Sequence, residues 1–393
     1  MAIDKTHKIP NAPNLRFPEF SEDWEECKVG DYGKVITGRT PPTKDSANYE
    51  DGKYLWASPA DLSDTKYISN TQTRLSALGF SKTCKLPKGS ILATCIGSTI
   101  GKMGMASTEM STNQQINAIV VSSNSDNHFV YYALQSRFPK YLMSVAVQAV
   151  PIMSKSTFEH LVNYTTCIEE QHKIGSLLNL IDERISTQIG AIEDYKKLKG
   201  YLIDELIEQR GRTMKIGDVI AQRTERNRKN DDYTVLSVNN QKGFIAQSEQ
   251  FEEREVASED KSNYKIVRRD DFAYNPARIN VGSIARLSNY DCGIVSPMYI
   301  CFHSDERVLP EFLGYFFESR YFATEVDKRL EGSVRLCLSY DGLCDISIQI
   351  LNVENQQAII QKLDAVSQKI ALEEQCLDLF KQQKAYLLKN MFV

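Results

Sequence analysis

The chain lacks several features that assign a protein to a familiar class. It has no apolar run near the ~20 residues that a membrane span needs, and its first 20 residues carry no hydrophobic region typical of a secretory signal. Its 9 cysteines are scattered, with no CxxC pair and no zinc-ligand spacing. We therefore expect free thiols, no bound metal, no membrane contact and a reducing, cytoplasmic compartment.

Complete catalytic motifs are also missing. The segment Gly97–Met103 is similar to a phosphate-binding loop, but it is one residue short and lacks the Ser or Thr that holds Mg²⁺. The segment Asn275–Arg278 is similar to the Asn-Pro-Pro-aromatic motif of amino-methyltransferases without its second Pro and its aromatic residue. The 5 histidines form no triad or metal pattern. The sequence predicts a protein that is not an enzyme and binds no cofactor.

A basic excess is absent as well. The formal net charge is −4, whereas a nonspecific nucleic-acid binder usually has a basic domain. A protein that reads a sequence with a few locally concentrated basic residues remains compatible with this charge.

The strongest positive signal is a duplicated 40-residue stretch. Ile168–Ile207 returns as Val353–Phe392 with nine identical positions, and neither copy contains Pro. In the first copy, apolar residues follow the spacing of a coiled-coil seam: Ile174, Leu178, Ile181, Ile185, Ile192, Tyr195, Leu202 and Leu206. The pattern predicts two long helices, each the partner of the other.

The segment before each helix is also repeated. KIGDVIAQRT at 215–224 is similar to KVGDYGKVITGRT at 28–40, and FLGYFFESRYFATEV at 312–326 to FVYYALQSRFPKYLM at 129–143. Both segments carry short β-branched and aromatic runs broken by Gly, Pro and Ser, which indicates an α+β fold. We expect a leader (1–20), a domain (21–167), a helix (168–210), a second domain (211–352) and a second helix (353–393).

This order constrains the geometry. Short connections favour antiparallel pairing of the helices, with a pseudo-twofold relation between two similar domains at opposite ends of an antiparallel coiled coil. Two domains related in this way match a ligand that has its own dyad and a helical repeat of about 34 Å, which is duplex DNA.

Taken together, these pieces resemble the specificity subunit of type I restriction–modification enzymes over essentially the whole chain. The resemblance lies in NLRFPEFSEDWEECKVGDYGKVITGRTPPT, in KGSILATCIGSTIGKMG followed by NQQINAIV, and in EEQHKIGSLLNLIDERI with its second copy ENQQAIIQKLDAV. The second copy departs where Gln171-His172-Lys173 becomes Gln356-Gln357-Ala358, and the second domain has a weaker IGKMG signature.

The resemblance implies two target recognition domains, each reading one half of a bipartite target in double-stranded DNA, with the helices setting the gap. It implies a noncatalytic subunit that directs DNA methylation. Two methyltransferase (M) subunits would bind it, and two restriction (R) subunits would join in the full complex.

Candidate DNA-binding residues are basic, amide and hydroxyl side chains at predicted loops. Arginine pairs with guanine or phosphate, and paired amides match the edge of adenine. In the first domain they are Arg39, Thr40, Thr43, Lys44, Ser98, Thr99, Lys102, Gln114 and Gln115, with Asn113 beside them. In the second they are Arg223, Arg226, Arg228, Lys229, Asn275, Arg278 and Asn280. Solvated surface loops are the alternative for each group.

The first helix carries more apolar surface than one seam needs. We expect helices of another protein to dock on Leu177, Ile189, Leu198 and Ile203, unless the two domains cover these side chains. Two other functions stay open at this point: a nuclease or methyltransferase with divergent motifs, and a coiled-coil adaptor that binds only protein.

Overall fold

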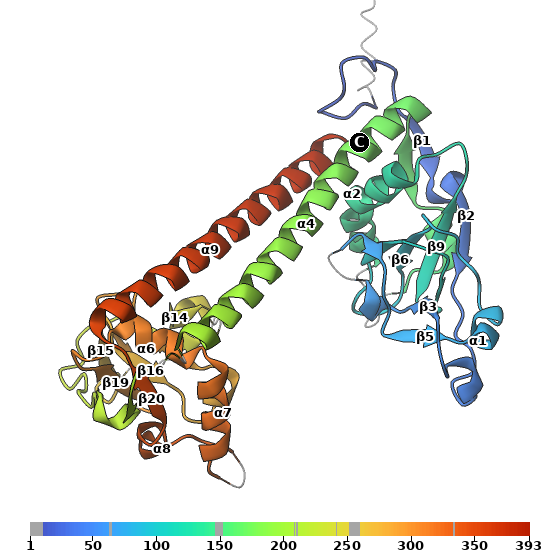
Figure 1. Cartoon of the computed structure of the whole chain (residues 1–393). Helices are drawn as coiled ribbons and strands as arrows, with labels where there is room; N and C mark the ends of the chain where they lie inside the picture. The colour runs from blue at the N-terminus through green and yellow to red at the C-terminus, as the bar shows by residue number, and fades with distance from the viewer. Residues whose placement is uncertain are drawn as a thin grey trace, which may run out of the picture. The chain divides into compact units, whose positions relative to one another are not determined.

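The computed structural model describes residues 11–62, 65–145, 152–207, 209, 211–240, 242–250, 260–332 and 335–393. It divides into two compact units. Unit 1 runs to Gly190 and includes Glu374–Val393, and unit 2 is Ala191–Glu373. Two long helices, α4 (Ile168–Ile207) and α9 (Val353–Asn390), each contribute one half to each unit (Figure 1). The first half of the expected leader, residues 1–10, lies outside the described residues.

Unit 1 is an α+β domain built on a mixed sheet. Its five-stranded sheet has the order β2-β9-β6-β7-β4, a second sheet has the order β5-β3-β8, and β1 pairs with β10. The strands are β1 (Glu25–Lys28), β2 (Gly33–Thr37), β3 (Tyr54–Ala57), β4 (Tyr67–Ile68), β5 (Thr73–Leu75), β6 (Ile91–Thr94), β7 (Met103–Ala106), β8 (Ser111–Thr112), β9 (Ile116–Val121) and β10 (Val162–Thr165). The helices are η1 (Val29–Tyr32), η2 (Ser46–Asn48), η3 (Pro59–Asp61), α1 (Ala77–Ser81), α2 (Asn127–Val145) and α3 (Lys155–Glu159).

Unit 2 repeats most of this topology. Its sheets have the orders β12-β19-β16-β17 and β14-β13-β18-β15, and β11 pairs with β20. The strands are β11 (Arg212–Lys215), β12 (Ile220–Gln222), β13 (Val235–Asn239), β14 (Gly243–Ala246), β15 (Lys265–Arg268), β16 (Phe272–Tyr274), β17 (Ile284–Arg286), β18 (Cys292–Val295), β19 (Ile300–Ser304) and β20 (Ser347–Ile350). The helices are η4 (Ile216–Asp218), α5 (Gln247–Gln250), η5 (Ile279–Val281), α6 (Pro310–Phe317), α7 (Arg320–Arg329) and α8 (Tyr340–Cys344).

Four strands of one sheet (β2-β9-β6-β7 and β12-β19-β16-β17) and three of the other (β5-β3-β8 and β14-β13-β18) correspond, so the predicted duplication of an α+β domain is confirmed. Among the described residues, β4 in unit 1 and β15 in unit 2 have no counterpart in the other unit. In both units the first strand of this sheet in sequence pairs with the last one in sequence, β2 with β9 and β12 with β19. That last strand also pairs with the first strand of a hairpin, which is β6–β7 in unit 1 and β16–β17 in unit 2. The other sheet of each unit contains one parallel pair, β3 with β8 and β13 with β18. The segment KGSILATCIGSTIGKMG covers β6 and the start of β7, and the repeated segment at 129–143 lies in α2.

Each unit closes its core with halves of both long helices. In unit 1, Ile174 and Leu178 of α4 share a core with Met391 and Phe392, which follow α9. In unit 2, the residues from α4 are Ile203, Leu206 and Ile207, and those from α9 are Ile359, Ile360 and Leu363. Because these side chains leave water only when both helix halves are in place, neither core is complete without them.

Within each unit the two helix halves run antiparallel. In unit 1, Asp182 pairs with Lys384 (2.7 Å), and Arg184, further along α4, lies 5.4 Å from the ring of Phe380, earlier in α9. In unit 2, Lys369 of α9 lies 5.8 Å from the ring of Tyr195 of α4. The predicted antiparallel pairing is confirmed, whereas the five-part division of the chain stays a prediction because both helices are shared between the units.

A buried glutamine near the start of each long helix fixes that helix to its domain. In unit 1, Gln171 donates to the carbonyl of Thr166 (2.7 Å) and accepts from the N–H of Asp126 (3.0 Å). In unit 2, Gln356 donates to the carbonyls of Leu351 (2.8 Å) and Arg307 (2.9 Å) and accepts from the N–H of Leu309 (2.8 Å). The identical position of the two sequence copies therefore has one structural role.

None of the helices in the described part of the chain is both long enough and apolar enough to cross a membrane.

We predict that Gln356→Leu lowers the free energy of unfolding by about 2–3 kcal/mol, because it leaves three backbone groups around a buried position without partners. Urea unfolding followed by circular dichroism measures this change. Gln361→Leu, an exposed position on the same helix, is the matched control and should leave the midpoint unchanged. Equal midpoints for the two variants would contradict the anchoring role.

Candidate nucleic-acid interface

Three loops meet at one end of the main sheet of unit 1. Because β2 pairs antiparallel with β9, β9 with β6 and β6 with β7, the ends of β2 and β6 lie beside the starts of β9 and β7. The loops at this end are residues 38–45, 95–102 and 113–115, here named loop cluster 1. They contain every residue of the first domain that the sequence marked as a candidate for DNA binding.

Backbone bonds hold the first of these loops against the third. The N–H of Arg39 donates to the carbonyl of Thr112 (2.9 Å), and the hydroxyl of Thr40 donates to Oε1 of Gln114. A Cβ on Gly38 would lie 2.1 Å from the carbonyl oxygen of Asn113, so only glycine permits this approach. The exposed part of the loop is thus set at a fixed place relative to the amide side chains.

The hairpin turn 95–102 lies against the same amides. The N–H of Cys95 donates to the carbonyl of Gln115 (2.8 Å), whose side chain accepts from Nδ2 of Asn113 (2.9 Å). Gly97 and Gly101 have φ values of +97° and +95°, a conformation that favours glycine and turns the chain tightly. This turn presents Ser98 and Lys102 to solvent.

The outer surface of loop cluster 1 is basic and polar. Arg39, Lys44 and Lys102 are exposed, and none of them forms an ion pair with a residue that the structure describes. Thr43, Ser98 and Gln114 are exposed too, whereas Asn113 is buried. Cations without a carboxylate partner beside hydroxyl and amide groups suit contact with phosphates and base edges.

Unit 2 brings together the corresponding loops. The antiparallel pairs β12–β19, β19–β16 and β16–β17 place residues 223–230, 275–283 and 296–299 at one end of the sheet, here named loop cluster 2. The N–H of Arg278 donates to the carbonyl of Asn275 (3.0 Å), which closes the hairpin loop. Arg278 and Asn280 are exposed, and Asn275 is half-buried.

Arg223 differs from the other candidates. Its Nε lies 2.5 Å from Oδ2 of Asp271, a carboxylate that is only 2% exposed. A buried carboxylate needs its counter-ion, so Arg223 has a structural role that a sequence-level view of a basic loop does not reveal. The contact of Arg223 with DNA stays a prediction, and the ion pair with Asp271 is a second role for this side chain.

The remaining basic residues of that loop point to solvent. Arg226, Arg228 and Lys229 are exposed, and the one hydrogen bond from these side chains within the described residues joins Arg226 to Asn263 (3.2 Å). Buried Asn227 shapes the turn by donating to the carbonyl of Asp231 (2.9 Å) and accepting from its N–H (2.9 Å).

Sequence reasoning missed one loop of the second domain. Residues 296–299 precede β19 as 113–115 precede β9, and Met298 is 61% exposed there. A pocket of about 240 Å³ beside it is lined by Asn275, Arg278 and Met298 among others. The repeat could have pointed to this loop through its position before the last strand, but Ser-Pro-Met shares no chemistry with Asn-Gln-Gln.

Reactive groups are not prominent at either cluster. Burial raises the pKa of Cys95 to about 11 and that of Cys301 to about 12, so these thiols stay protonated near neutral pH. Among the described residues, no group of three or more His, Cys, Asp or Glu side chains is arranged to hold a metal ion. The exposed basic, hydroxyl and amide side chains of the clusters can form hydrogen bonds and ion pairs.

The expected docking residues on α4 have different surroundings. Ile203 is 2% exposed in the core of unit 2, and Leu177 packs partly buried against the core of unit 1. Ile203 is therefore covered by the second domain and is not free for another protein, whereas docking on Leu177 stays a prediction. Ile189 is half-buried, and Leu198 remains 44% exposed.

Known proteins share these features. Residues 21–193 match the family model described as type I restriction modification DNA specificity domain. These residues belong to that family. The first sheet-bearing domain is thus a specificity domain, and the resemblance to type I specificity subunits is confirmed.

Two relatives and one solved structure resemble the chain beyond the specificity domain. The MjaIX specificity subunit of Methanocaldococcus jannaschii is 29% identical over 195 residues, which cover 47% of this chain and 44% of that protein. The MjaVIII specificity subunit of the same organism is 22% identical and covers 95% of this chain and 92% of its own. The S subunit of a type I restriction-modification system from M. genitalium has the same fold, with a TM-score of 0.61, 16% identity and coverage of 97% and 99%.

We predict that Arg223→Ala lowers the free energy of unfolding by about 3 kcal/mol, because Asp271 would be left buried without its counter-ion. Arg226→Ala, which removes an exposed charge three residues away, is the control and should unfold like the parent chain in urea. The double variant Arg223→Ala/Asp271→Ala should recover part of the loss. A stable Arg223→Ala variant would show that the ion pair is dispensable.

Proposed function

We propose that this protein is the DNA sequence-specificity subunit of a type I restriction–modification complex and is itself noncatalytic. In this proposal loop cluster 1 and loop cluster 2 each read one half of a bipartite target in double-stranded DNA. The observation that supports this most strongly is that one fold, present twice, carries two loop clusters of different composition at the same end of its sheet.

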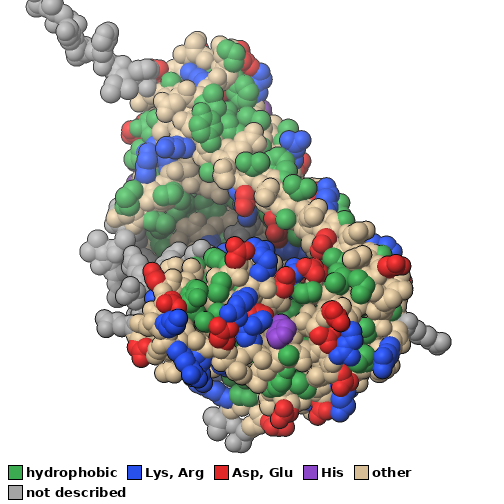
Figure 2. All heavy atoms as spheres, turned by 90° about the vertical axis from the view of Figure 1, so that its left-hand side faces the viewer, with side chains coloured by type: hydrophobic (Ala, Val, Ile, Leu, Met, Phe, Trp, Pro, Cys, Tyr) green, Lys and Arg blue, Asp and Glu red, His purple; other side chains and the backbone are tan. Residues whose placement is uncertain are grey.

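The chemistry of the clusters fits base and phosphate contact. Arg39 and Lys102 in cluster 1, and Arg226, Arg228 and Lys229 in cluster 2, supply exposed cations for phosphates or guanine. Gln114 supplies an amide for adenine. The basic side chains do not form one continuous basic surface on the face drawn in Figure 2, because Lys and Arg lie interleaved with Asp and Glu there.

The partners we propose are two methyltransferase subunits and, in the full complex, two restriction subunits. Exposed apolar residues on the long helices support a protein partner. Leu198 and Tyr201 of α4 are 44% and 59% exposed, and they lie three residues apart, so they adjoin on one helix face. We further propose a cytoplasmic location, where the nine free cysteines stay thiols.

Selection from a random-site DNA pool tests the function. The purified chain with its methyltransferase partner should enrich two short motifs separated by a gap of fixed length. Enrichment of one uninterrupted motif, or of none, would argue against a bipartite target. Cleavage or methyl transfer by the chain alone would show that it is an enzyme.

We predict that Arg39→Ala/Lys102→Ala weakens DNA binding and lowers the salt slope of log K by about 2, since about two phosphate contacts are lost. The control is Lys34→Ala/Lys88→Ala, which removes two exposed charges next to the starts of β2 and β6, at the opposite end of the sheet. Fluorescence anisotropy with a DNA duplex over a range of salt concentrations measures both slopes. Equal slopes for the two variants would place the interface elsewhere.

We predict that Leu198→Ser/Tyr201→Ser weakens assembly with the methyltransferase subunit at least tenfold, because two exposed apolar side chains at a protein interface contribute more than ~1.4 kcal/mol. Analytical ultracentrifugation measures the assembly. Leu78→Ser, which removes an apolar side chain that is 48% exposed on α1, is the control. Unchanged assembly of the double variant would exclude this face of α4 as the contact.

A further inference from the structure

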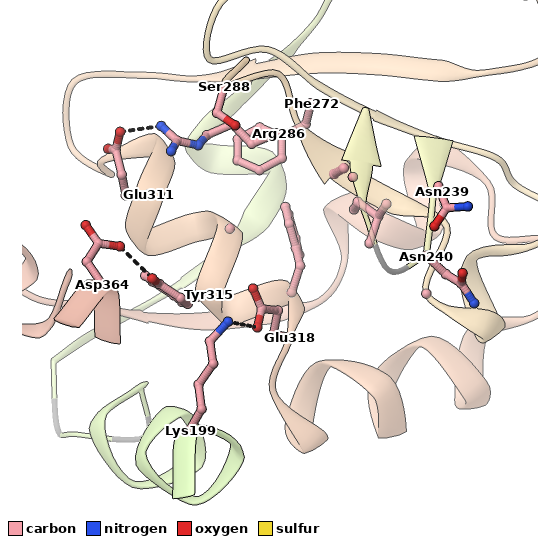
Figure 3. A pocket seen from close by; sticks show the side chains of 16 residues that line it. Lys199, Asn239, Asn240, Phe272, Arg286, Ser288, Glu311, Tyr315, Glu318 and Asp364 are labelled. Carbon is pink, nitrogen blue, oxygen red and sulfur yellow. Dashed lines mark hydrogen bonds and ion pairs between the residues drawn. The ribbon is translucent and has the colours of Figure 1, made fainter. Parts of the chain in front are cut away.

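A pocket of about 610 Å³ lies in unit 2, with Gly282 of loop cluster 2 among its lining residues. Side chains from α4, α6, β17 and α9 line it, and Figure 3 shows three paired groups around it. Nζ of Lys199 pairs with Glu318 (2.8 Å), and the hydroxyl of Tyr315 donates to Asp364 (2.6 Å). Arg286 pairs with Glu311.

The internal repeat shows what occupies the same place in unit 1. There, Tyr132 of α2 corresponds to Tyr315, and Lys384 corresponds to Lys199, because each lysine lies over the ring of the respective tyrosine (5.5 and 5.2 Å). Each tyrosine hydroxyl also donates to an aspartate on the long helix that starts in that unit. The two sites thus share a frame of one tyrosine, one lysine and one carboxylate.

In unit 1 a lysine fills this frame. Lys66 is 5% exposed, and its Nζ lies 2.8 Å from Oδ1 of Asn179, 3.1 Å from the hydroxyl of Tyr132 and 2.5 Å from Nδ1 of His128. Lys66 lies directly before β4, the edge strand that pairs with β7. Burial is the main cause that lowers the pKa of Lys66, to about 7, which reflects how fully this ammonium is removed from water.

Unit 2 has the frame without such a lysine. Among the residues that the structure describes, its sheet ends at β17, the counterpart of β7, and no further strand follows. Glu311 lies four residues before Tyr315, as His128 lies four residues before Tyr132, and Asp364 aligns with Asn179 in the two copies of the long helix. Asp364 has no lysine or arginine partner in the described part of the chain. The pocket therefore has one carboxylate, Asp364, without a cationic partner among the described residues, and no lysine in the place that Lys66 takes in unit 1.

We propose that this pocket binds a primary alkylammonium group in the place that Lys66 takes in unit 1. The three N–H donors of the ammonium would reach Asp364, the hydroxyl oxygen of Tyr315 and Glu318. Its alkyl chain would lie against Phe317 and Ile284, which line the same pocket. A charge-assisted hydrogen bond to a partly desolvated carboxylate is stronger than one between neutral groups, which favours the cation over a neutral ligand.

Such a group has two sources, a free diamine or a lysine side chain of a bound protein. Isothermal titration calorimetry on the full chain at low salt distinguishes them with putrescine and with N-acetyl-lysine methylamide. Tighter binding of putrescine supports a free diamine, and tighter binding of the lysine derivative supports a protein. N-acetyl-norleucine methylamide, which lacks the ammonium, should not bind; if neither amine binds, or if the neutral compound binds equally well, the proposal is overturned.

Asp364→Asn tests the site itself. It keeps an acceptor for Tyr315 but removes the charge, and binding should weaken about tenfold. Asp378→Asn, the same change at an exposed position of α9, is the matched control. Equal affinity of Asp364→Asn and the parent chain, or an equal loss in the control, would overturn the proposal.

A second variant covers the case in which Asp364→Asn unfolds. Ser288 is exposed and lines the pocket, so Ser288→Lys places a tethered ammonium at its rim, as Lys66 does in unit 1. This variant should compete with the free amine and weaken its binding. Unchanged binding would show that amines bind elsewhere.

Discussion

Neither unit of this protein has a complete core without half of each long helix. In unit 1 the ring of Trp24, near the start of the described chain, packs 6.0 Å from that of Phe392, and the N–H of Leu15 donates to the carbonyl of Asn390 (2.8 Å). The last turn of α9 is thus part of the first domain. Since burial of these apolar side chains drives folding, the cores themselves hold the helices in place.

This constraint explains which features the two units share. Gln171 and Gln356 satisfy the same kind of backbone groups where each long helix starts, and Tyr132 and Tyr315 donate to an aspartate further along it. These polar groups are buried or half-buried, so each needs its partner. Residues of this kind fix the junction between helix and sheet and leave the far end of the sheet free to vary.

The end of the sheet that carries the loop cluster differs between the two units in both shape and chemistry. Cluster 1 is held by amides that bond to one another and to Thr40, whereas cluster 2 has the exposed Met298 beside a small pocket. A shared scaffold with different loops is what two unlike half-sites would require. The two units also differ beside β7 and its counterpart β17, where the proposed alkylammonium pocket lies. Unit 1 has the additional strand β4 there, and the described part of unit 2 has none.

The sequence by itself determined the elements and their repetition. Apolar spacing and the absence of proline marked both long helices, and the order of short strands and glycine turns marked two equivalent domains, because these signals are local. The sequence also predicted most loops of the two clusters, because turns are recognised from their residue types. Only the tertiary structure decided which side chains are free. Ile203 is covered by the second domain, and Arg223 forms an ion pair with Asp271. The loop at 296–299 lines a pocket together with Asn275 and Arg278, which are distant from it in sequence. Burial and ion pairing depend on contacts between distant segments, and no local pattern encodes them.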